Sequence, residues 1–301
     1  MRALVTGGAG FIGSNLVDAL AEAGAAVTVV DTLVTGRREN VRAGATLAEV
    51  DVADAQALDA VVAATAPEVV FHLAAQVDVR RSVADPARDL IVNVAGTINV
   101  LEAARRHGPG HVVLASTGGA IYGEAERVPT PEAAPARPPA PYGASKLAAE
   151  HYCRLYADLH GVPVTALRFA NVYGPRQDPL GEGGVVAIFC RRAADAGTAV
   201  IFGDGRQTRD FVHVGDVVDA LLAAVGAGFG PFNIGTGHET SVLELAERLG
   251  VATRHEPERA GEVRRSCLDP SRAARDLGWV PRIPLADGLE RTLEWVRAGQ
   301  P

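Results

Sequence analysis

The sequence has few cysteines and no long apolar run, and each absence excludes a class of protein. Its three cysteines lie far apart and form no Cys-x-x-Cys pair, so we expect no disulfide framework, no zinc cluster and no other metal site. No segment approaches the ~18 consecutive apolar residues that cross a bilayer. The first residues lead directly into a glycine turn without an apolar secretory segment. We therefore expect a cytoplasmic protein with no membrane partner.

Lysine is almost missing from the chain. Among 29 lysine and arginine residues, Lys146 is the only lysine. This scarcity predicts for Lys146 a role that needs a compact ammonium group and that the planar guanidinium of arginine fits poorly.

Charge and hydropathy are close to the globular average. The net charge is −7, 48% of the residues are hydrophobic and 22% are charged, and the mean hydropathy is +0.10. These values exclude a disordered chain, and the negative charge argues against a nucleic-acid partner. At ~150 residues per domain, the 301 residues correspond to one large domain or two modest ones. We expect a small-molecule substrate.

Short apolar strands alternate with helical patterns in the first part of the chain. The alternation predicts a Rossmann-type α/β fold, in which a doubly wound parallel sheet is covered by helices on both faces. The expected strands are 2–6, 26–30, 46–50, 69–73, 111–115 and 164–169, and the expected helices are 11–23, 55–64, 90–106 and 142–159.

The alternation loosens towards the C-terminus. The proline-rich segment 124–141 is expected to be a loop. We expect residues 1–170 to form a nucleotide-binding domain and residues 171–301 to form a smaller α/β lobe that binds the substrate. Within the lobe, residues 211–235 are expected to fold back onto the first sheet.

A glycine-rich turn follows the first expected strand and opens a helix. Gly7 permits a tight turn, Gly10 lets the backbone approach a pyrophosphate, and Gly13 allows close packing of helix and strand. Asp31 lies 18 residues after Gly13, where a carboxylate accepts hydrogen bonds from a ribose 2′-hydroxyl and repels a 2′-phosphate. The pattern predicts that NAD, rather than NADP, is the cofactor. Asp51 ends the third strand, where it can meet the adenine or, alternatively, cap the next helix.

Tyr142 and Lys146 are four residues apart in an expected helix, so both side chains project from one face. A free tyrosine is a poor base at neutral pH, but a nearby ammonium group and the positive nicotinamide ring of NAD⁺ favour its phenolate form. We predict that Tyr142 is a general base and that Lys146 also holds the nicotinamide ribose. The alternative is that the two residues are simply neighbours on a helix.

Four motifs give the sequence a family resemblance: Thr6–Gly13, Phe71–Ala75, Tyr142–Lys146 and Arg168–Pro175. With them the chain resembles the extended short-chain dehydrogenase/reductases. Within that family it is most similar to the NAD-dependent nucleotide-sugar epimerases of bacteria that act on UDP-galactose and UDP-glucose. The resemblance covers essentially the whole length, including residues 208–214 and 232–237.

The resemblance implies a UDP-sugar 4-epimerase with tightly held NAD. Tyr142 would remove the proton of the sugar C4 hydroxyl, a transient 4-keto sugar would form and rotate, and no net redox change would result. It also implies a homodimer, formed through the Tyr142 helix and the helix before the catalytic strand. The further cofactor contacts that it implies are Phe11, Ile12, Val52, Leu73, Ala74 and Ala75.

A third catalytic hydroxyl is expected after strand 111–115. Counting forward from the strand gives Thr117, whereas counting back from Tyr122 gives Gly118. We expect the extra residue to form a bulge at the double glycine. Thr117 is the preferred catalytic residue and Ser116 the alternative, unless these hydroxyls only satisfy backbone groups at the strand end.

The same loop argues against dehydration. Nucleotide-sugar 4,6-dehydratases of this family carry an Asp-Glu pair directly after the catalytic threonine. Gly118 and Gly119 offer neither an acid nor a base, so we do not expect elimination of water.

The resemblance also implies a UDP-sugar site in the second lobe. It assigns Asn171 to the diphosphate, Arg209 and Arg259 to the phosphates or the uridine ribose, and Glu262 to a ribose hydroxyl. Ser266 stands where some epimerases have a large tyrosine, so we expect N-acetylated UDP-sugars to be accepted. The remaining expected contacts are the backbone of Gly184 and Val185, and Phe202 against the uracil.

Other functions share most of these residues. A UDP-glucuronate 4-epimerase or decarboxylase would also need a cation or hydroxyls facing C6. A reductase that uses free NAD(P)H would share the Tyr–Lys pair. A non-catalytic NAD-sensing regulator is disfavoured because both Tyr142 and Lys146 are present.

Overall fold

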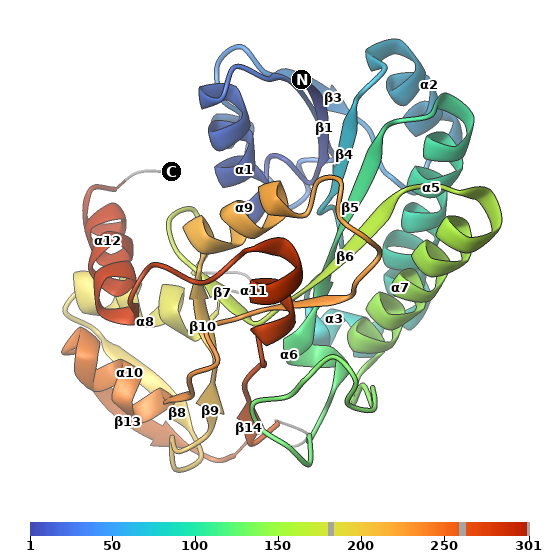
Figure 1. Cartoon of the computed structure of the whole chain (residues 1–301). Coiled ribbons are helices and arrows are strands. Elements are labelled where there is room, and N and C mark those ends of the chain that lie inside the picture. The colour runs from blue at the N-terminus through green and yellow to red at the C-terminus, as the bar shows by residue number, and fades with distance from the viewer. Residues whose placement is uncertain (180–183, 259–262, 300–301) are drawn as a thin grey trace.

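A seven-stranded parallel sheet forms the centre of the molecule (Figure 1). The computed structural model describes residues 1–179, 184–258 and 263–299. The sheet order is β11-β6-β5-β4-β1-β2-β3, so the direction of winding changes between β1 and β4, where open α/β sheets bind their ligands. The predicted doubly wound sheet is therefore confirmed. The strands are β1 Arg2–Thr6, β2 Ala26–Asp31, β3 Thr46–Glu49, β4 Val69–His72, β5 His111–Thr117, β6 Val164–Phe169 and β11 Phe232–Ile234.

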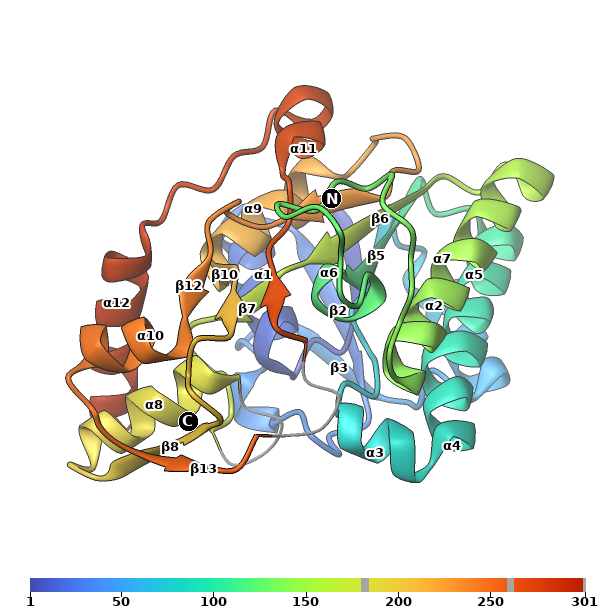
Figure 2. The same cartoon turned by 90° about the horizontal axis from the view of Figure 1, so that it is seen from below.

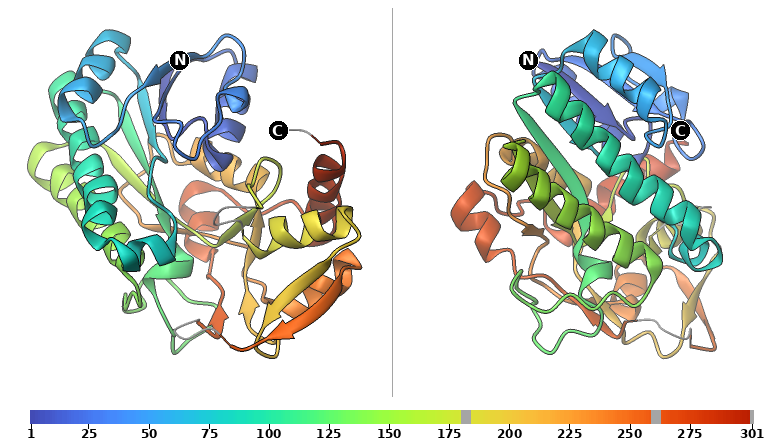
Figure 3. Two further views of the ribbon diagram at one scale, coloured as in Figure 1. Left: turned by 180° about the vertical axis from the view of Figure 1, so that it is seen from behind. Right: turned by 90° about the vertical axis from the view of Figure 1, so that its right-hand side faces the viewer.

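Helices cover both faces of the sheet. Successive strand residues are apolar and point to alternate faces, so each face has to be buried under a layer of helices. Leu4 and Val70 pack into one core, while Val5 and Phe71 pack into the other. One face is covered by α1 Phe11–Glu22 and α9 Val214–Ala223, the other by α2 Ala55–Thr65, α5 Gly96–His107 and α7 Pro141–His160. Figure 3 shows the last three lying side by side.

The chain returns to this sheet after leaving it. β7 Asn171–Tyr173 pairs with β10 Phe211–His213, and α9 then packs on α1. β11 pairs in parallel with β6, with Phe232 opposite Leu167. A late segment thus supplies both an edge strand and a covering helix to the sheet built by the N-terminal part.

The remaining elements form a lobe around a third core (Figure 2). Its helices are α8 Val185–Ala194, α10 Val242–Leu249 and α12 Leu285–Arg297, while α11 Ser271–Leu277 lies against β11. Its strands form one pair, β8 Thr198–Phe202 with β13 Ala252–Glu256, and a triplet of β12 Thr240–Ser241, β9 Thr208–Arg209 and β14 Arg265–Ser266.

The helix expected over 90–106 is more complex than predicted. It begins as α4 Pro86–Leu90, passes through a π-helical turn at Ile91–Ala95 and continues as α5. A short helix, α3 Val79–Ala84, precedes it and was not predicted. π-Helical turns are frequent at functional sites.

The expected bulge at the double glycine is wrong. β5 runs through Thr117, and Gly118–Ile121 form a short helix, α6. A Cβ on Gly118 would lie 2.4 Å from Leu268 Cδ1. The glycine therefore lets the chain coil tightly against a buried leucine, and the extra residue is absorbed in this turn.

None of the helices in the described residues is both long enough and apolar enough to cross a membrane. The same residues contain no group of three or more histidines, cysteines and carboxylates that could hold a metal ion.

Candidate active site

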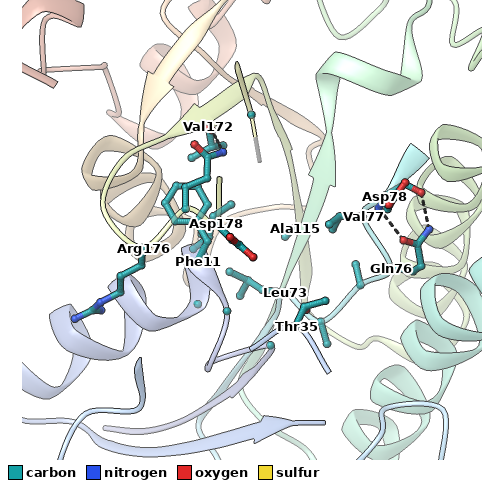
Figure 4. Close-up of a pocket in the computed structure, with 18 of the residues that line it drawn as sticks. Phe11, Thr35, Leu73, Gln76, Val77, Asp78, Ala115, Val172, Arg176 and Asp178 are labelled. Atoms are coloured by element: carbon teal, nitrogen blue, oxygen red, sulfur yellow. Dashed lines mark hydrogen bonds between the residues drawn. The ribbon is translucent and has the colours of Figure 1, made fainter. Parts of the chain in front are cut away.

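A cavity of about 1100 Å³ opens at the carboxyl ends of β1, β2, β4 and β5 (Figure 4). It extends from this edge of the sheet into the lobe, where Val185, Phe211 and Trp295 line it. The cavity brings together most of the residues selected from the sequence. Those in its wall are Gly7, Gly10, Phe11, Ile12, Gly13, Asp31, Asp51, Val52, Leu73, Ala74, Ala75, Ser116, Tyr142, Lys146, Asn171, Gly184 and Val185.

The glycine loop leaves its backbone accessible from the cavity. Gly7 has φ +72°, and a Cβ there would lie 2.7 Å from the backbone nitrogen of Ala74. A Cβ on Gly13 would lie 2.1 Å from the Gly7 carbonyl oxygen, so the turn and the start of α1 require glycine. A Cβ on Gly10 would meet only that same oxygen, at 3.3 Å. Gly10 therefore faces open space, as a backbone that receives a pyrophosphate must.

Asp31 is fixed at the end of β2 by backbone donors. The backbone N–H of Ala9 donates to Oδ2 at 3.0 Å, and that of Leu33 donates to Oδ1 at 2.9 Å. The carboxylate is 8% exposed and lies in the cavity wall. A negative charge at this point disfavours a ligand phosphate beside it.

Asp51 does not cap the following helix. Asp54 caps α2, accepting from the backbone of Gln56 and Ala57. Asp51 instead accepts a hydrogen bond from Arg88 at 3.1 Å, and both side chains line the cavity. Of the two alternatives left by the sequence, the helix cap is therefore wrong.

The Tyr142 phenol lies in the cavity wall, close to the end of β5. The Thr117 side chain lies close enough to the Tyr142 phenol to lower its pKa, although Thr117 itself does not line the cavity. Burial raises the pKa of Tyr142 to about 12; Thr117 lowers this pKa, and the charge of Asp89 raises it further. The phenol is therefore protonated at neutral pH in the chain alone.

Lys146, one helical turn after Tyr142 on α7, also lines the cavity. It is 4% exposed, and its Nζ donates to the Ala115 carbonyl oxygen at 3.0 Å. Burial lowers the pKa of Lys146 to about 8, opposed by the charge of Asp89 and by Cys153 and Glu150. The side chain still carries a positive charge at neutral pH.

Ser116 is directed away from the phenol. Its Oγ donates at 2.5 Å to Oε1 of Glu150, and Glu150 is paired with Arg168 at 2.7 Å. Arg168 also donates to the Tyr122 hydroxyl at 2.7 Å. This buried network holds β5, β6 and α7 together, so Thr117, and not Ser116, contacts Tyr142.

Asn171 lies close to Thr117. A Cβ on Gly119 would be 3.7 Å from Asn171 Oδ1 and 4.0 Å from Thr117 Oγ1. Gly184 precedes α8 and Val185 begins it, so the N-terminus of that helix opens on the cavity. Backbone N–H groups at such an end favour an anionic ligand.

Three expected substrate residues lie in the lobe outside the cavity wall. Arg209 in β9 and Ser266 in β14 are register partners in a parallel pair, so they share one face of that sheet. Phe202 ends β8 beside a small hollow that Gln207 also lines. The two other expected residues, Arg259 and Glu262, lie outside the described residues.

Several cavity residues carry no spacing signal in the sequence. Asn40 is buried and donates to the Ala9 carbonyl oxygen at 3.1 Å, which joins the loop after β2 to the glycine loop. Gln76 follows β4 and is held by the backbone of Asp78, as Figure 4 shows. Arg176 and Trp295 come from distant parts of the chain. The position of Gln76 directly after the motif 71–75 was the nearest available signal.

Comparisons with known proteins agree with this geometry. The model of the NAD dependent epimerase/dehydratase family matches residues 3–235. A UDP-glucose 4-epimerase of Mycolicibacterium smegmatis is 48% identical over 310 residues, covering 99% of each chain. The crystal structure of a UDP-glucose 4-epimerase from Thermotoga maritima with UDP-glucose has a TM-score of 0.97 at 45% identity, covering 99% of both chains. That of a Thermus thermophilus UDP-glucose 4-epimerase in complex with NAD has a TM-score of 0.93 at 42% identity, again covering 99% of both.

Proposed function

Because the chain belongs to the NAD dependent epimerase/dehydratase family, we propose that it inverts C4 of a UDP-sugar, interconverting UDP-glucose and UDP-galactose through a transient 4-keto sugar. The observation that carries this proposal is the presence of Tyr142 and Lys146 in the wall of one cavity that begins at a glycine loop, with Thr117 close enough to the phenol to lower its pKa. An acid–base pair of this kind can take a proton from a sugar hydroxyl and return it.

The cavity fits NAD. Gly10 faces open space where a diphosphate can approach the start of α1, and Asp31 stands at the end of β2 with its oxygens fixed. The glycine loop, Asp31 and Lys146 would hold the cofactor. When bound, NAD supplies the acceptor and later the donor of the C4 hydride.

The chain itself moves the proton. Tyr142 accepts the C4 hydroxyl proton once positive charge has lowered the pKa of its phenol, and it returns the proton when the ketone is reduced. Thr117 lowers the pKa of the phenol and so stabilises the phenolate. Lys146, fixed by the Ala115 carbonyl oxygen, supplies a positive charge near the reacting atoms.

The double glycine supports epimerisation over dehydration. Gly119 adjoins both Thr117 and Asn171, the place from which a carboxylate would reach the neighbouring carbons of the sugar. Neither Gly118 nor Gly119 carries an acid or base, so a C5 proton and a C6 hydroxyl would find no catalyst there.

The lobe is proposed to hold the UDP group. Asn171, Gly184 and Val185 are cavity residues suited to the diphosphate. Arg209 and Ser266 share a sheet face, with Phe202 as the proposed uracil contact. Arg259 and Glu262 stay predictions from the sequence. In this proposal residues 1–170 carry the cofactor site and 171–301 the substrate lobe.

A homodimer and a cytoplasmic location complete the proposal. On α7, Leu155 and Leu159 are 47% and 71% exposed. Apolar contacts with a second copy of the chain would bury both side chains. Light scattering on the purified protein measures the mass that decides between a monomer and a dimer.

The proposed function is tested without added cofactor. Purified protein is incubated separately with UDP-glucose, UDP-galactose, UDP-glucuronate and dTDP-glucose, and the products are separated by chromatography. Interconversion of UDP-glucose and UDP-galactose is expected. A decarboxylated or 4-keto-6-deoxy product, or activity confined to UDP-glucuronate, would contradict it.

A further inference from the structure

A carboxylate is buried behind the catalytic helix with one oxygen unpartnered. Asp89, in α4, is 1% exposed. Its Oδ1 accepts from Gln76 Nε2 at 2.9 Å and from Asn93 Nδ2 at 3.1 Å. Its Oδ2 is buried and has no hydrogen-bond partner in the described part of the chain. Such groups are rare in native proteins and call for an explanation.

The bonds of Asp89 join the cavity wall to α7. Asn93 Oδ1 accepts from the backbone N–H of Gln76 at 2.8 Å, and Asn93 Nδ2 donates to Ser145 Oγ at 3.1 Å. Ser145 stands between Tyr142 and Lys146 on α7, and its hydroxyl donates to the Tyr142 carbonyl oxygen at 3.0 Å. The π-helical turn carries Asn93 at its centre. Asp89 therefore sits at the back of a connection that ends at the turn of α7 that carries Tyr142 and Lys146.

Among the groups that act on Lys146, the charge of Asp89 is the least compensated. Glu150, on α7, is paired with Arg168 at 2.7 Å. Burial raises the pKa of the Cys153 thiol, and burial lowers the pKa of His72, on β4, to about 3, so both are neutral at pH 7. Asp89 has neutral amide donors on one oxygen and none on the other.

A purely structural role would not require this charge. Asparagine in place of Asp89 offers an Oδ1 that accepts the same two hydrogen bonds, without the large cost of burying an ionised oxygen that lacks a donor. The two hydrogen bonds alone therefore do not explain why an aspartate stands at this position.

We propose that Asp89 is a positioning residue for the reaction: its buried carboxylate, joined to α7 through Asn93 and Ser145, acts on the Lys146 ammonium group, and its hydrogen bonds hold Gln76 in the cavity wall. This inference rests on the proposed function for its catalytic meaning. Its electrostatic part is a property of the folded chain alone. The same charge raises the pKa of Tyr142, so its removal shifts both groups in the same direction.

The single lysine of the chain makes a direct measurement possible. Protein labelled with ¹³C at the lysine Cε gives one resonance, that of Lys146, whose chemical shift is followed against pH. We expect Asp89→Asn to lower the Lys146 pKa by about one unit, as removal of a nearby opposite charge does. Asp89→Leu removes the charge together with the acceptor oxygens, and it has to give the same downward shift of the Lys146 pKa. If Asp89→Asn does not fold, Asp89→Leu carries the test alone.

Asp216→Asn is the matched control. Asp216 is also 1% exposed, but its two oxygens accept from the backbone of Arg282 and Ile283, at 3.0 and 3.1 Å. We expect it to lower thermal stability and to leave the Lys146 titration unchanged. Asp89→Glu keeps the negative charge, so the Lys146 pKa in this variant is expected to stay close to the wild-type value.

Activity supplies the second readout. In Asp89→Asn both limbs of the kcat–pH profile are expected to move to lower pH by about one unit. A Lys146 pKa that is unchanged in both charge-free variants overturns the proposal, as does an equal shift in Asp216→Asn. If the titration shifts as expected but no UDP-sugar is interconverted by the wild-type protein, the charge effect of Asp89 is supported and the proposed function is contradicted.

Discussion

Asp18 and Arg176 form an ion pair of 2.7 Å between α1, which follows the glycine loop, and the loop that leads from β7 towards α8. Asn15, one helical turn before Asp18, donates to the Pro175 carbonyl oxygen at 3.2 Å. Arg176 has φ +72°, a left-handed conformation that residues other than glycine rarely adopt. The helix that follows the glycine loop therefore also fixes the loop that leads towards α8.

Weakening this pair is expected to affect substrate binding. Asp18→Asn removes the charge that anchors Arg176, whose side chain is partly exposed. We expect KM for the UDP-sugar to rise about two- to fivefold, as the loss of such a pair implies, with kcat nearly unchanged. Steady-state kinetics checks this. Asp158→Asn, which breaks an exposed pair with Arg154 on α7, is the control, and an equal rise in KM there would contradict the expectation.

Tyr142→Phe is expected to lower kcat by about 10²–10⁴-fold, because it removes the proton acceptor and little volume. Bound NAD and UDP-sugar affinity should persist, measured by absorbance and by calorimetry. Ser116→Ala is the matched control from the neighbouring strand end. Its hydroxyl bonds Glu150 and not the phenol, so this variant should lose about 1 kcal/mol of stability and keep its turnover. A Ser116→Ala protein as inactive as Tyr142→Phe would transfer the role to Ser116.

Cofactor preference follows from Asp31. Its oxygens are already held by backbone N–H groups of Ala9 and Leu33, so the carboxylate cannot turn away from a 2′-phosphate. We expect NAD⁺ to bind at least about tenfold more tightly than NADP⁺, as a carboxylate at this position implies. Titration of cofactor-free protein followed by fluorescence measures the ratio. Comparable affinities for the two cofactors would remove this role from Asp31.

His72 is expected to make the fold sensitive to acid. Burial lowers its folded pKa to about 3 from an ordinary 6.5, so below pH 6.5 the unfolded chain binds a proton that the folded chain does not. The contribution of His72 to stability is therefore full above pH 6.5 and falls by about 1.4 kcal/mol per pH unit between there and pH 3. Urea unfolding at pH 7, 6 and 5 should show this slope. His72→Gln, which still offers a donor and an acceptor to Thr6 and Thr97, should flatten it.

Ser266 is expected to leave room for an acetamido group on the sugar. It lies partly buried on β14 beside Arg209. We expect kcat/KM for UDP-N-acetylglucosamine to be within about tenfold of that for UDP-glucose, since a small cavity mismatch carries a penalty of this size. Ser266→Tyr should suppress only the acetylated substrate. Ser241→Tyr, on the other edge of the same small sheet, is the control. An unchanged substrate ratio in Ser266→Tyr would show that another residue limits the sugar pocket.

The sheet was predictable because its strands are short, apolar and buried on both faces, and because glycine and proline mark the turns between them. α3 and the π-helical turn were not predictable. The turn carries Asn93, whose side chain bonds Gln76 and Ser145, residues that lie far from it in the sequence. The sequence favoured Thr117 but left Ser116 open for a similar reason, because the contact with Tyr142 depends on residues that lie far apart in the chain. The choice is decided by Glu150, which draws Ser116 away, and by the packing of Gly118 on Leu268.

The glycine loop and the Tyr–Lys pair could be found from spacing alone, because each lies within one continuous segment. Asp89 could not. Its oxygen atoms, the donors that hold them and the ammonium group that they influence come from separate elements. No local pattern distinguishes it from the exposed aspartates around it, such as Asp85.

The late return of the chain to its first sheet sets an order on synthesis at the ribosome. The face of α1 that carries Leu16, Val17 and Leu20 is covered by α9, and β6 gains its outer neighbour only with β11. A nascent chain that has emerged only as far as β6 therefore presents an uncovered apolar face and an open sheet edge, both of which invite aggregation. The N-terminal part therefore cannot complete its folding before residues 214–234 have emerged from the ribosome.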